Sequence, residues 1–210
     1  MKVAVSYINS KYDPLKTINL IDSSIADYIH VDLMDGLYVE NKNFTISEIN
    51  KLLGKVKKPL YIHLMVMNPD KYLNDLALLN TELICFHPST SKDPIKLIDN
   101  IKNLGIKVGI VINPSENIDD FSKYFPLVDH VLLMSVTPGL GGQSFILNTV
   151  DKIKEIKEQN YSFELAVDGG INNETIKYLK DVDMVISGSF ICMSDDFNKA
   201  IKELKKTDED

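Results

Sequence analysis

Short apolar runs rich in β-branched and aromatic residues recur at a nearly regular interval along the whole chain. The runs cover 3–7, 28–33, 60–66, 83–86, 107–112, 130–134, 163–167 and 184–186. Eight runs in 210 residues leave about 26 residues for each run and the segment that follows it. That interval accommodates one strand, one helix and two short loops, so the chain is predicted to alternate strands and helices from end to end.

The segments between these runs have the spacing of amphipathic helices. The clearest covers 93–105, where Asp93 is a predicted N-cap, Pro94 suits the first helical position and Gly105 suits the C-terminal cap. Its apolar stripe consists of Leu97, Ile98, Ile101 and Leu104. Further helices are predicted over 14–21, 46–53, 69–79, 117–124, 150–158, 173–179 and 195–204.

Several of the eight runs are apolar at consecutive positions, which is typical of strands buried on both faces. Such strands, alternating with helices, predict an α/β protein with a parallel sheet covered by helices. Eight units favour a closed (β/α)₈ TIM barrel, because an open sheet of this kind normally stops at five or six strands. No linker or change in composition divides the chain, so residues 1–210 are expected to form one barrel domain. Its functional site should lie at the carboxyl ends of the strands.

Charge and cysteine content narrow the classes of protein to consider. Thirty acidic and 23 basic side chains give a formal net charge of −7, so neither nucleic acid nor a membrane surface is an expected partner. Two cysteines cannot form a disulfide framework, and no apolar stretch approaches the roughly 20 residues that cross a bilayer. The first residues lack an apolar segment with a cleavage site, so we expect a cytoplasmic protein. The mixed charges of 202–210 predict a helix end followed by a solvated tail.

Ionisable side chains stand where three of the predicted strands end. In the second strand a period of two places His30, Asp32 and Met34 on one face. His63 lies near the end of the third strand, and Asp168 ends the seventh, before two glycines. Each residue alone is explained by a hydrogen-bonded core or a turn. Together the two imidazoles and two carboxylates predict a site for a divalent cation such as zinc, manganese, iron or cobalt.

Glycines form a second group, in the loops after the sixth, seventh and eighth strands. They occur in the segments Gly139-Leu140-Gly141-Gly142, Gly169-Gly170 and Gly188-Ser189. Backbone N–H groups beside glycine can approach an anion closely, and barrels of this class commonly hold phosphate in the loops after strands seven and eight. Tight turns alone would also explain single glycines, but the clustering in three successive loops predicts a phosphorylated substrate.

Other residues at strand ends leave two interpretations open. Met34, Met65 and Met134 are either gap-filling core or an apolar collar around the reacting carbons of a substrate. Ser6, which ends the first strand, is able to bond a substrate or only its own turn.

The motifs at these strand ends resemble those of the ribulose-phosphate 3-epimerase family. The resemblance rests on HVDLMDG at 30–36, HLMV at 63–66, LMSVTPGLGGQSF at 133–145 and VDGGI at 167–171, and it extends from Ser6 to Ser189. It implies one bound divalent ion, zinc first among the candidates, with His30, Asp32, His63 and Asp168 as its ligands.

The resemblance also implies the roles of the residues around that ion. Asp32 and Asp168 would be the acid/base pair that interconverts D-ribulose 5-phosphate and D-xylulose 5-phosphate, and Ser6 and His63 would contact this phosphorylated ketose. The residues expected along its phosphate end are Gly139, Leu140, Gly141, Gly142, Asp168, Gly169, Gly170, Gly188 and Ser189. Members of the family tend to form oligomers, so a homo-oligomer is expected.

Three positions depart from the family pattern. Leu37 replaces a usual His, Glu40 a usual Pro and Thr137 a common Asn. These changes leave the sugar specificity open, so a 3-epimerase of a six-carbon ketose phosphate such as D-allulose 6-phosphate is the alternative function. A metal-free decarboxylase of the orotidine type would need a lysine at a strand end, whereas Lys107 begins a strand. A sugar-phosphate sensor would bind without turnover.

Overall fold

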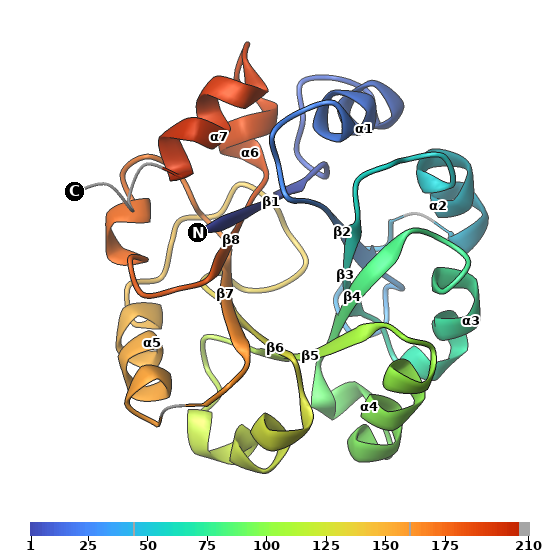
Figure 1. Cartoon of the computed structure of the whole chain (residues 1–210), viewed down its shortest axis with the longest axis vertical. Helices are drawn as coiled ribbons and strands as arrows, with labels where there is room; N and C mark the ends of the chain where they lie inside the picture. Colours follow the sequence, from blue (N-terminus) through green and yellow to red (C-terminus); the bar gives the residue numbers. More distant parts are fainter. Residues whose placement is uncertain (44, 160, 206–210) are drawn as a thin grey trace.

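Eight parallel strands close into a barrel in the computed structural model, which describes residues 1–43, 45–159 and 161–205 (Figure 1). The strands follow one another around the ring in chain order, and the last pairs with the first. They are β1 (Lys2–Ser6), β2 (Tyr28–Met34), β3 (Leu60–Met65), β4 (Thr81–Phe86), β5 (Lys107–Ile112), β6 (His130–Met134), β7 (Glu164–Asp168) and β8 (Met184–Ser187). All eight predicted strands and the predicted (β/α)₈ class are confirmed.

Helices surround the ring of strands on its outside (Figure 1). The α-helices are α1 (Pro14–Asp22), α2 (Ile46–Leu53), α3 (Leu73–Leu76), α4 (Pro94–Asn103), α5 (Thr149–Glu158), α6 (Ser189–Cys192) and α7 (Phe197–Lys205). The 3₁₀ helices are η1 (Pro69–Tyr72), η2 (Pro88–Thr90), η3 (Ile118–Leu127) and η4 (Ile176–Tyr178). Within the described ranges, no helix is long and apolar enough to cross a membrane. The tail expected over 206–210 lies outside the described residues.

The predicted caps of α4 are confirmed. The Asp93 side chain accepts a hydrogen bond from the backbone N–H of Lys96, and Pro94 begins the helix. Gly105 follows with φ +75°, a left-handed conformation that favours glycine. Leu104, expected in the buried stripe, is instead 39% exposed, because the helix ends at Asn103 and Leu104 turns away with the cap.

Three predicted α-helices were wrong in type or length. The one over 117–124 is the 3₁₀ helix η3, which contains Pro126 and has no side-chain cap at its start. The one over 69–79 divides into η1 and α3 and ends at Leu76. The one over 173–179 is reduced to η4, because the Asn172 side chain binds the N–H groups of Glu174 and Thr175 in a turn. Apolar spacing over one or two turns does not distinguish an α-helix from a 3₁₀ helix.

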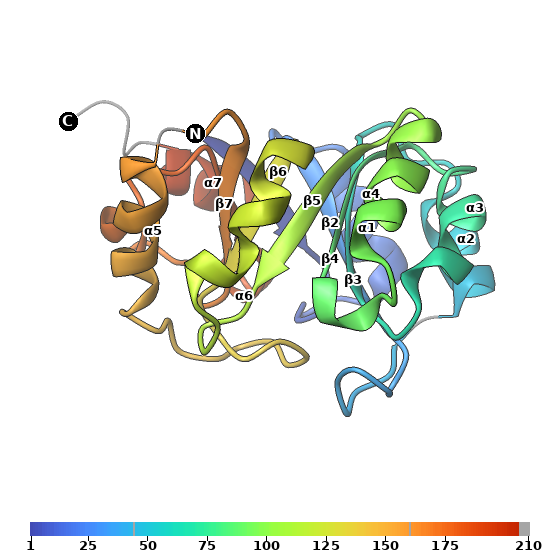
Figure 2. The same cartoon turned by 90° about the horizontal axis from the view of Figure 1, so that it is seen from below.

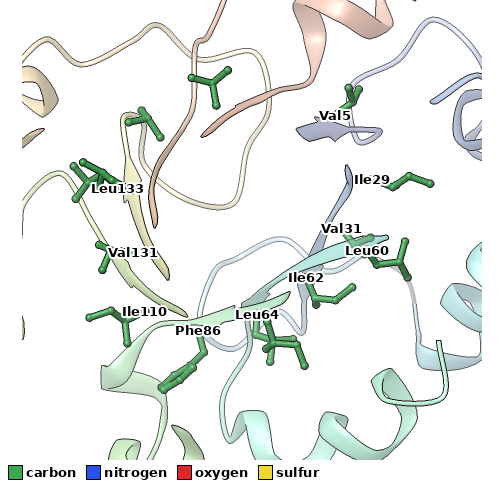
Figure 3. Packing of buried hydrophobic residues seen from close by; sticks show 14 of the residues in the cluster. Val5, Ile29, Val31, Leu60, Ile62, Leu64, Phe86, Ile110, Val131 and Leu133 are labelled. Atoms are coloured by element: carbon green, nitrogen blue, oxygen red, sulfur yellow. The ribbon is translucent and has the colours of Figure 1, made fainter. Parts of the chain in front are cut away.

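Strand residues alternate between two apolar layers. Side chains such as Leu64, Phe86 and Ile110 lie on the side of the strands that faces away from the centre of the ring (Figure 3). The opposite side chains fill the barrel, and they include Tyr28, Tyr61, Leu83, Cys85, Val111, Leu132, Ala166, Met184 and Ile186. Both cysteines are free and buried, as expected. The barrel is therefore a packed core and not a channel, which leaves its ends as the places for chemistry.

Two long loops project from the same end of the barrel (Figure 2). One follows β2 and the other follows β6. The side-chain amide of Asn41 in the first loop donates a hydrogen bond of 2.7 Å to the backbone oxygen of Gly139 in the second. Val39 packs so closely on Gly139 that a Cβ there would lie 3.0 Å from the Val39 Cβ. The loops thus support each other at the carboxyl ends of the strands.

Candidate active site

The four side chains expected to share a cation lie together at the carboxyl ends of β2, β3 and β7. One potential ligand atom from each of His30, Asp32, His63 and Asp168 lies within 4.8 Å of the other three. Asp32 Oδ1 is 3.3 Å from His30 Nε2 and 3.1 Å from His63 Nδ1. Asp168 Oδ2 is 3.5 Å from His30 Nε2. Ligands bound tetrahedrally at about 2.0–2.2 Å from one ion stand roughly 3.3–3.6 Å apart, so these separations suit a single small cation.

The charges of this cluster also fit a cation. Burial alone would raise the pKa of Asp32, but His30 and His63 offset it and hold that pKa below its usual range. Burial, opposed by His30 and reinforced by the charge of Asp32, raises the pKa of Asp168 to about 7. Two carboxylates in one buried site repel each other, and a divalent ion would neutralise both. The two imidazole nitrogens and two carboxylate oxygens are a donor set that Zn²⁺, Mn²⁺, Fe²⁺ and Co²⁺ accept.

A cavity of about 410 Å³ opens over the cluster. The expected site residues that line it are Ser6, Asp32, Met34, Met65, Met134, Gly139, Leu140, Gly141, Gly142, Asp168, Gly169, Gly170, Gly188 and Ser189. His30 and His63 are fully buried and are not among the lining residues. The two imidazoles therefore lie beneath the cavity, where they reach the other two ligands but not its open space.

The side chains near the cluster divide into a polar and an apolar group. Ser6 donates a hydrogen bond of 3.0 Å from its hydroxyl to Asp32 Oδ2, so it orients this carboxylate while also lining the cavity. Met34, Met65 and Met134 are buried and present apolar surface to the same space. The methionines therefore complete the core and also form part of the cavity wall.

The glycines after β6 and β7 adopt backbone conformations that other residues rarely adopt. Gly139, Gly142, Gly169 and Gly170 have φ values of +109°, +76°, +120° and +64°. A Cβ on Gly169 would lie 2.4 Å from Val136 Cγ2, and one on Gly170 would lie 2.5 Å from the backbone nitrogen of Phe145. The turn geometry therefore requires these glycines, and the same turns expose backbone beside the cavity.

The three departures from the family pattern lie apart from the cluster. Leu37 is 75% exposed, and Glu40 and Thr137 line an adjacent cleft between the loops after β2, β5 and β6, which shares Gly139 and Leu140 with the cavity. Across the described residues, none of the three lines the cavity, and neither does any lysine. The lysine that an orotidine-type decarboxylase would need is thus missing from this part of the structure.

Three residues near the site were not predicted. His87 follows β4, and its Nε2 lies 2.9 Å from His63 Nε2. Tyr38 packs its ring against His87 with a centroid separation of 4.5 Å. Asn9 donates from its amide to the Ser189 hydroxyl at 2.8 Å and faces Gly142. His87 could have been predicted as a site residue, because it directly follows a strand and the candidate ligands also lie near strand ends. Tyr38 and Asn9 occur in loops without a distinctive sequence pattern.

Solved structures with this fold match over almost the whole chain. Phosphoribosyl anthranilate isomerase from Thermococcus kodakaraensis has a TM-score of 0.67 and 13% sequence identity, with 100% of this chain and 99% of that chain covered. KGPDC from Streptococcus mutans has a TM-score of 0.71 and 14% identity, with coverage of 98% and 96%. At such low identity the similarity shows a shared fold alone.

Relatives at higher identity show the family. A ribulose-phosphate 3-epimerase of Helicobacter pylori is 40% identical over 212 residues, which covers 98% of this chain and 97% of the relative. Those of Bacillus subtilis and Escherichia coli are 32% and 35% identical, covering 98% and 86% of this chain and 98% and 83% of the relatives. The sequence profile of the Ribulose-phosphate 3 epimerase family matches residues 2–192, and this chain belongs to that family.

Proposed function

We propose that the protein is a metal-dependent epimerase that interconverts D-ribulose 5-phosphate and D-xylulose 5-phosphate by inverting the configuration at C3. Membership of the family supports the reaction class. The observation that carries the metal dependence is the cluster of two imidazoles and two carboxylates, with their ligand atoms within 4.8 Å of one another. One divalent ion, zinc first among the candidates, is the proposed cofactor.

The two carboxyl groups supply the proton transfers. Inversion at a carbon beside a ketone requires a base that removes a proton from one face and an acid that returns one to the other face. Asp32 and Asp168 belong to different strands and both line the cavity. Asp32 and Asp168 are therefore the proposed acid/base pair, and the pKa of Asp168, about 7, suits proton transfer near neutral pH. In the reverse reaction the two residues exchange roles.

A divalent ion bound by the four side chains would stabilise the negative charge of the enediolate, which is worth several kcal/mol. The protein contributes the remaining features of the site. Ser6 orients the Asp32 carboxylate through its hydrogen bond, and the three methionines keep water from the reacting carbons.

The phosphate end of the substrate is assigned to the far side of the cavity. Glycines from the loops after β6 and β7 line the cavity together with Gly188 and Ser189, so backbone from three loops borders one space. Asn9, which bonds the Ser189 hydroxyl, belongs to the same wall. Such backbone donors bind an anion without a basic side chain.

Two substrates and a chelator test this function. The purified protein is incubated with ribulose 5-phosphate and, separately, with allulose 6-phosphate, before and after removal of metal and after addition of zinc. We expect turnover of the pentose phosphate that chelation abolishes and zinc restores. Turnover of allulose 6-phosphate without turnover of ribulose 5-phosphate would reject the pentose assignment. Full activity in a protein verified to contain no metal would reject the metal dependence.

A further inference from the structure

A third histidine stands behind the proposed metal ligands. His87 directly follows β4, and its side chain is buried, with 1% of the residue exposed. Its Nε2 lies 2.9 Å from Nε2 of His63, which is a hydrogen-bond distance. Within the described residues His87 Nδ1 has no hydrogen-bond partner, so the side-chain hydrogen bond of this buried imidazole is the one to His63.

The ring of His87 is held from its other side by the loop after β2. The Tyr38 ring packs against it at 4.5 Å between centroids and an angle of 39°. The Tyr38 hydroxyl in turn accepts a hydrogen bond of 3.0 Å from the Asn113 side chain, just beyond β5. These contacts fix the His87 ring in position, so its bond to His63 has a defined geometry.

The two nitrogens of His63 face different partners. Nδ1 lies 3.1 Å from Asp32 Oδ1 and is the atom that joins the ligand cluster, whereas Nε2 faces His87. A neutral imidazole carries one proton, and only the nitrogen without it can bind a cation. If Nδ1 binds the ion, Nε2 must carry the proton and donate it to Nε2 of His87, whose own proton is then on Nδ1.

The opposite arrangement of protons excludes the ion. If His87 donated from Nε2, His63 would carry its proton on Nδ1 and donate it to Asp32, and no lone pair would face the cluster. The hydrogen bond between the two histidines therefore selects between a site ready for a cation and a closed hydrogen-bond network.

We propose that His87 is a positioning residue for the metal ion, accepting the Nε2–H of His63 and thereby directing the Nδ1 lone pair of His63 at the ion. The inference rests on the proposed function, because it requires that His30, Asp32, His63 and Asp168 hold a cation. It adds a fifth side chain, outside the ligand set, to the residues on which the metal affinity depends.

Two substitutions separate the acceptor from the bulk of the ring. His87→Phe keeps a ring against Tyr38 but has no acceptor, and His87→Gln places an amide oxygen near the position of Nε2. Zinc affinity of the metal-free proteins is measured by competition with a chromophoric chelator. We expect His87→Phe to bind zinc about 10–100-fold more weakly than the unsubstituted protein and His87→Gln to recover most of the loss.

His130 offers a matched control. It is also a fully buried imidazole, beside Tyr61. Among the described residues its Nε2 has no hydrogen-bond partner, and its Nδ1 lies 4.0 Å from Glu164, so it is not bonded to His63. His130→Phe and His130→Gln should therefore leave zinc affinity within about threefold of the unsubstituted protein. Zinc affinity falls when a hydrogen-bond partner of a metal ligand is removed, and His130 is not such a partner. Equal losses at positions 87 and 130 would overturn the proposal, because they would reflect general disturbance of the barrel.

The remaining outcomes are equally decisive. Unchanged zinc affinity in a folded His87→Phe variant overturns the role of His87 while leaving the proposed function intact. Failure of the unsubstituted protein to bind any of zinc, manganese, iron and cobalt overturns the metal dependence and this inference together. Nitrogen-15 NMR of the unsubstituted zinc-loaded protein needs no variant: protons on His63 Nε2 and His87 Nδ1 are expected, and a proton on His87 Nε2 overturns the proposal.

Discussion

Asp32 and Asp168 reach the same ring nitrogen of His30 from different strands of the barrel. His30 Nε2 lies 3.3 Å from Asp32 Oδ1 and 3.5 Å from Asp168 Oδ2. The pKa values of the two carboxyl groups move apart. Burial would raise both, but His30 and His63 hold that of Asp32 below its usual range, whereas burial and the charge of Asp32 raise that of Asp168 to about 7. This separation supports the proposed assignment of Asp32 and Asp168 as the acid/base pair.

Replacing Asp168 should slow the reaction severely and retain the fold. Asp168→Asn keeps the shape of the side chain but cannot exchange a proton, so kcat should fall by about 10²–10⁴-fold. The measurement is the rate of epimerisation of ribulose 5-phosphate, together with the circular dichroism spectrum as a check of folding. Asp151→Asn, at an exposed carboxylate on α5 that pairs with Lys154, is the control and should retain full activity. Undiminished turnover by Asp168→Asn would contradict the assignment.

Metal binding should raise the melting temperature of the protein. An ion that binds the folded chain at 100 times its Kd adds about 2.7 kcal/mol to the free energy of unfolding. Thermal unfolding is therefore measured on metal-free protein with and without added zinc, manganese or cobalt. The same titration on a His30→Ala variant, which lacks one proposed ligand, should give a much smaller shift. An equal shift in both proteins would mean that the ions bind elsewhere.

Enlarging Gly170 should disturb the loops at the phosphate end. A Cβ at this position would lie 2.5 Å and 2.9 Å from the backbone N and Cα of Phe145, and backbone cannot move aside as a side chain can. Gly170→Ala is expected to raise KM for the sugar phosphate and to lower the free energy of unfolding.

The matched control for that change is Gly105→Ala. Gly105 also has a positive φ, but nothing lies within 4 Å of its would-be Cβ, and it follows α4 away from the cavity. Alanine there should cost about 1–2 kcal/mol of stability through backbone strain alone and leave KM unchanged. If both variants raised KM equally, the loop after β7 would have no special part in substrate binding.

A buried histidine at the amino end of β6 should make the protein sensitive to acid. Burial, with smaller contributions from Lys2, His30 and Lys107, lowers the pKa of His130 to about 3. Below pH about 6.5 the unfolded chain binds a proton on this ring, whereas the folded chain does not until about pH 3, so stability falls as pH falls through this window.

A neutral side chain at this position should remove the effect. Relative to His130→Gln, the unsubstituted protein should lose about 1.4 kcal/mol of unfolding free energy for each pH unit below about 6.5. Urea unfolding of the two metal-free proteins at pH 7, 6 and 5 gives this difference. A difference that stays constant with pH would show that His130 is not kept neutral.

Interactions between neighbouring residues explain why the strands and the limits of α4 could be predicted from the sequence. The strand period placed His30 and Asp32 on one face, and the cap residues Asp93 and Gly105 delimited α4, because these effects act over a few neighbouring residues. The convergence of Asp168 with the residues of β2 and β3 was also predictable, because a closed parallel barrel brings all carboxyl ends to one face.

The contacts between loops at the carboxyl end of the barrel depend on the tertiary structure and could not be predicted from the sequence. The apposition of His87 with His63 depends on the register of β3 against β4, and the bond from Asn41 to Gly139 joins loops almost 100 residues apart. No pattern within one segment specifies such pairs. The positions of the strands and the identity of the potential metal ligands thus follow from the sequence alone. The orientation of each ligand depends on side chains, such as His87 beside His63, that only the three-dimensional packing brings into contact.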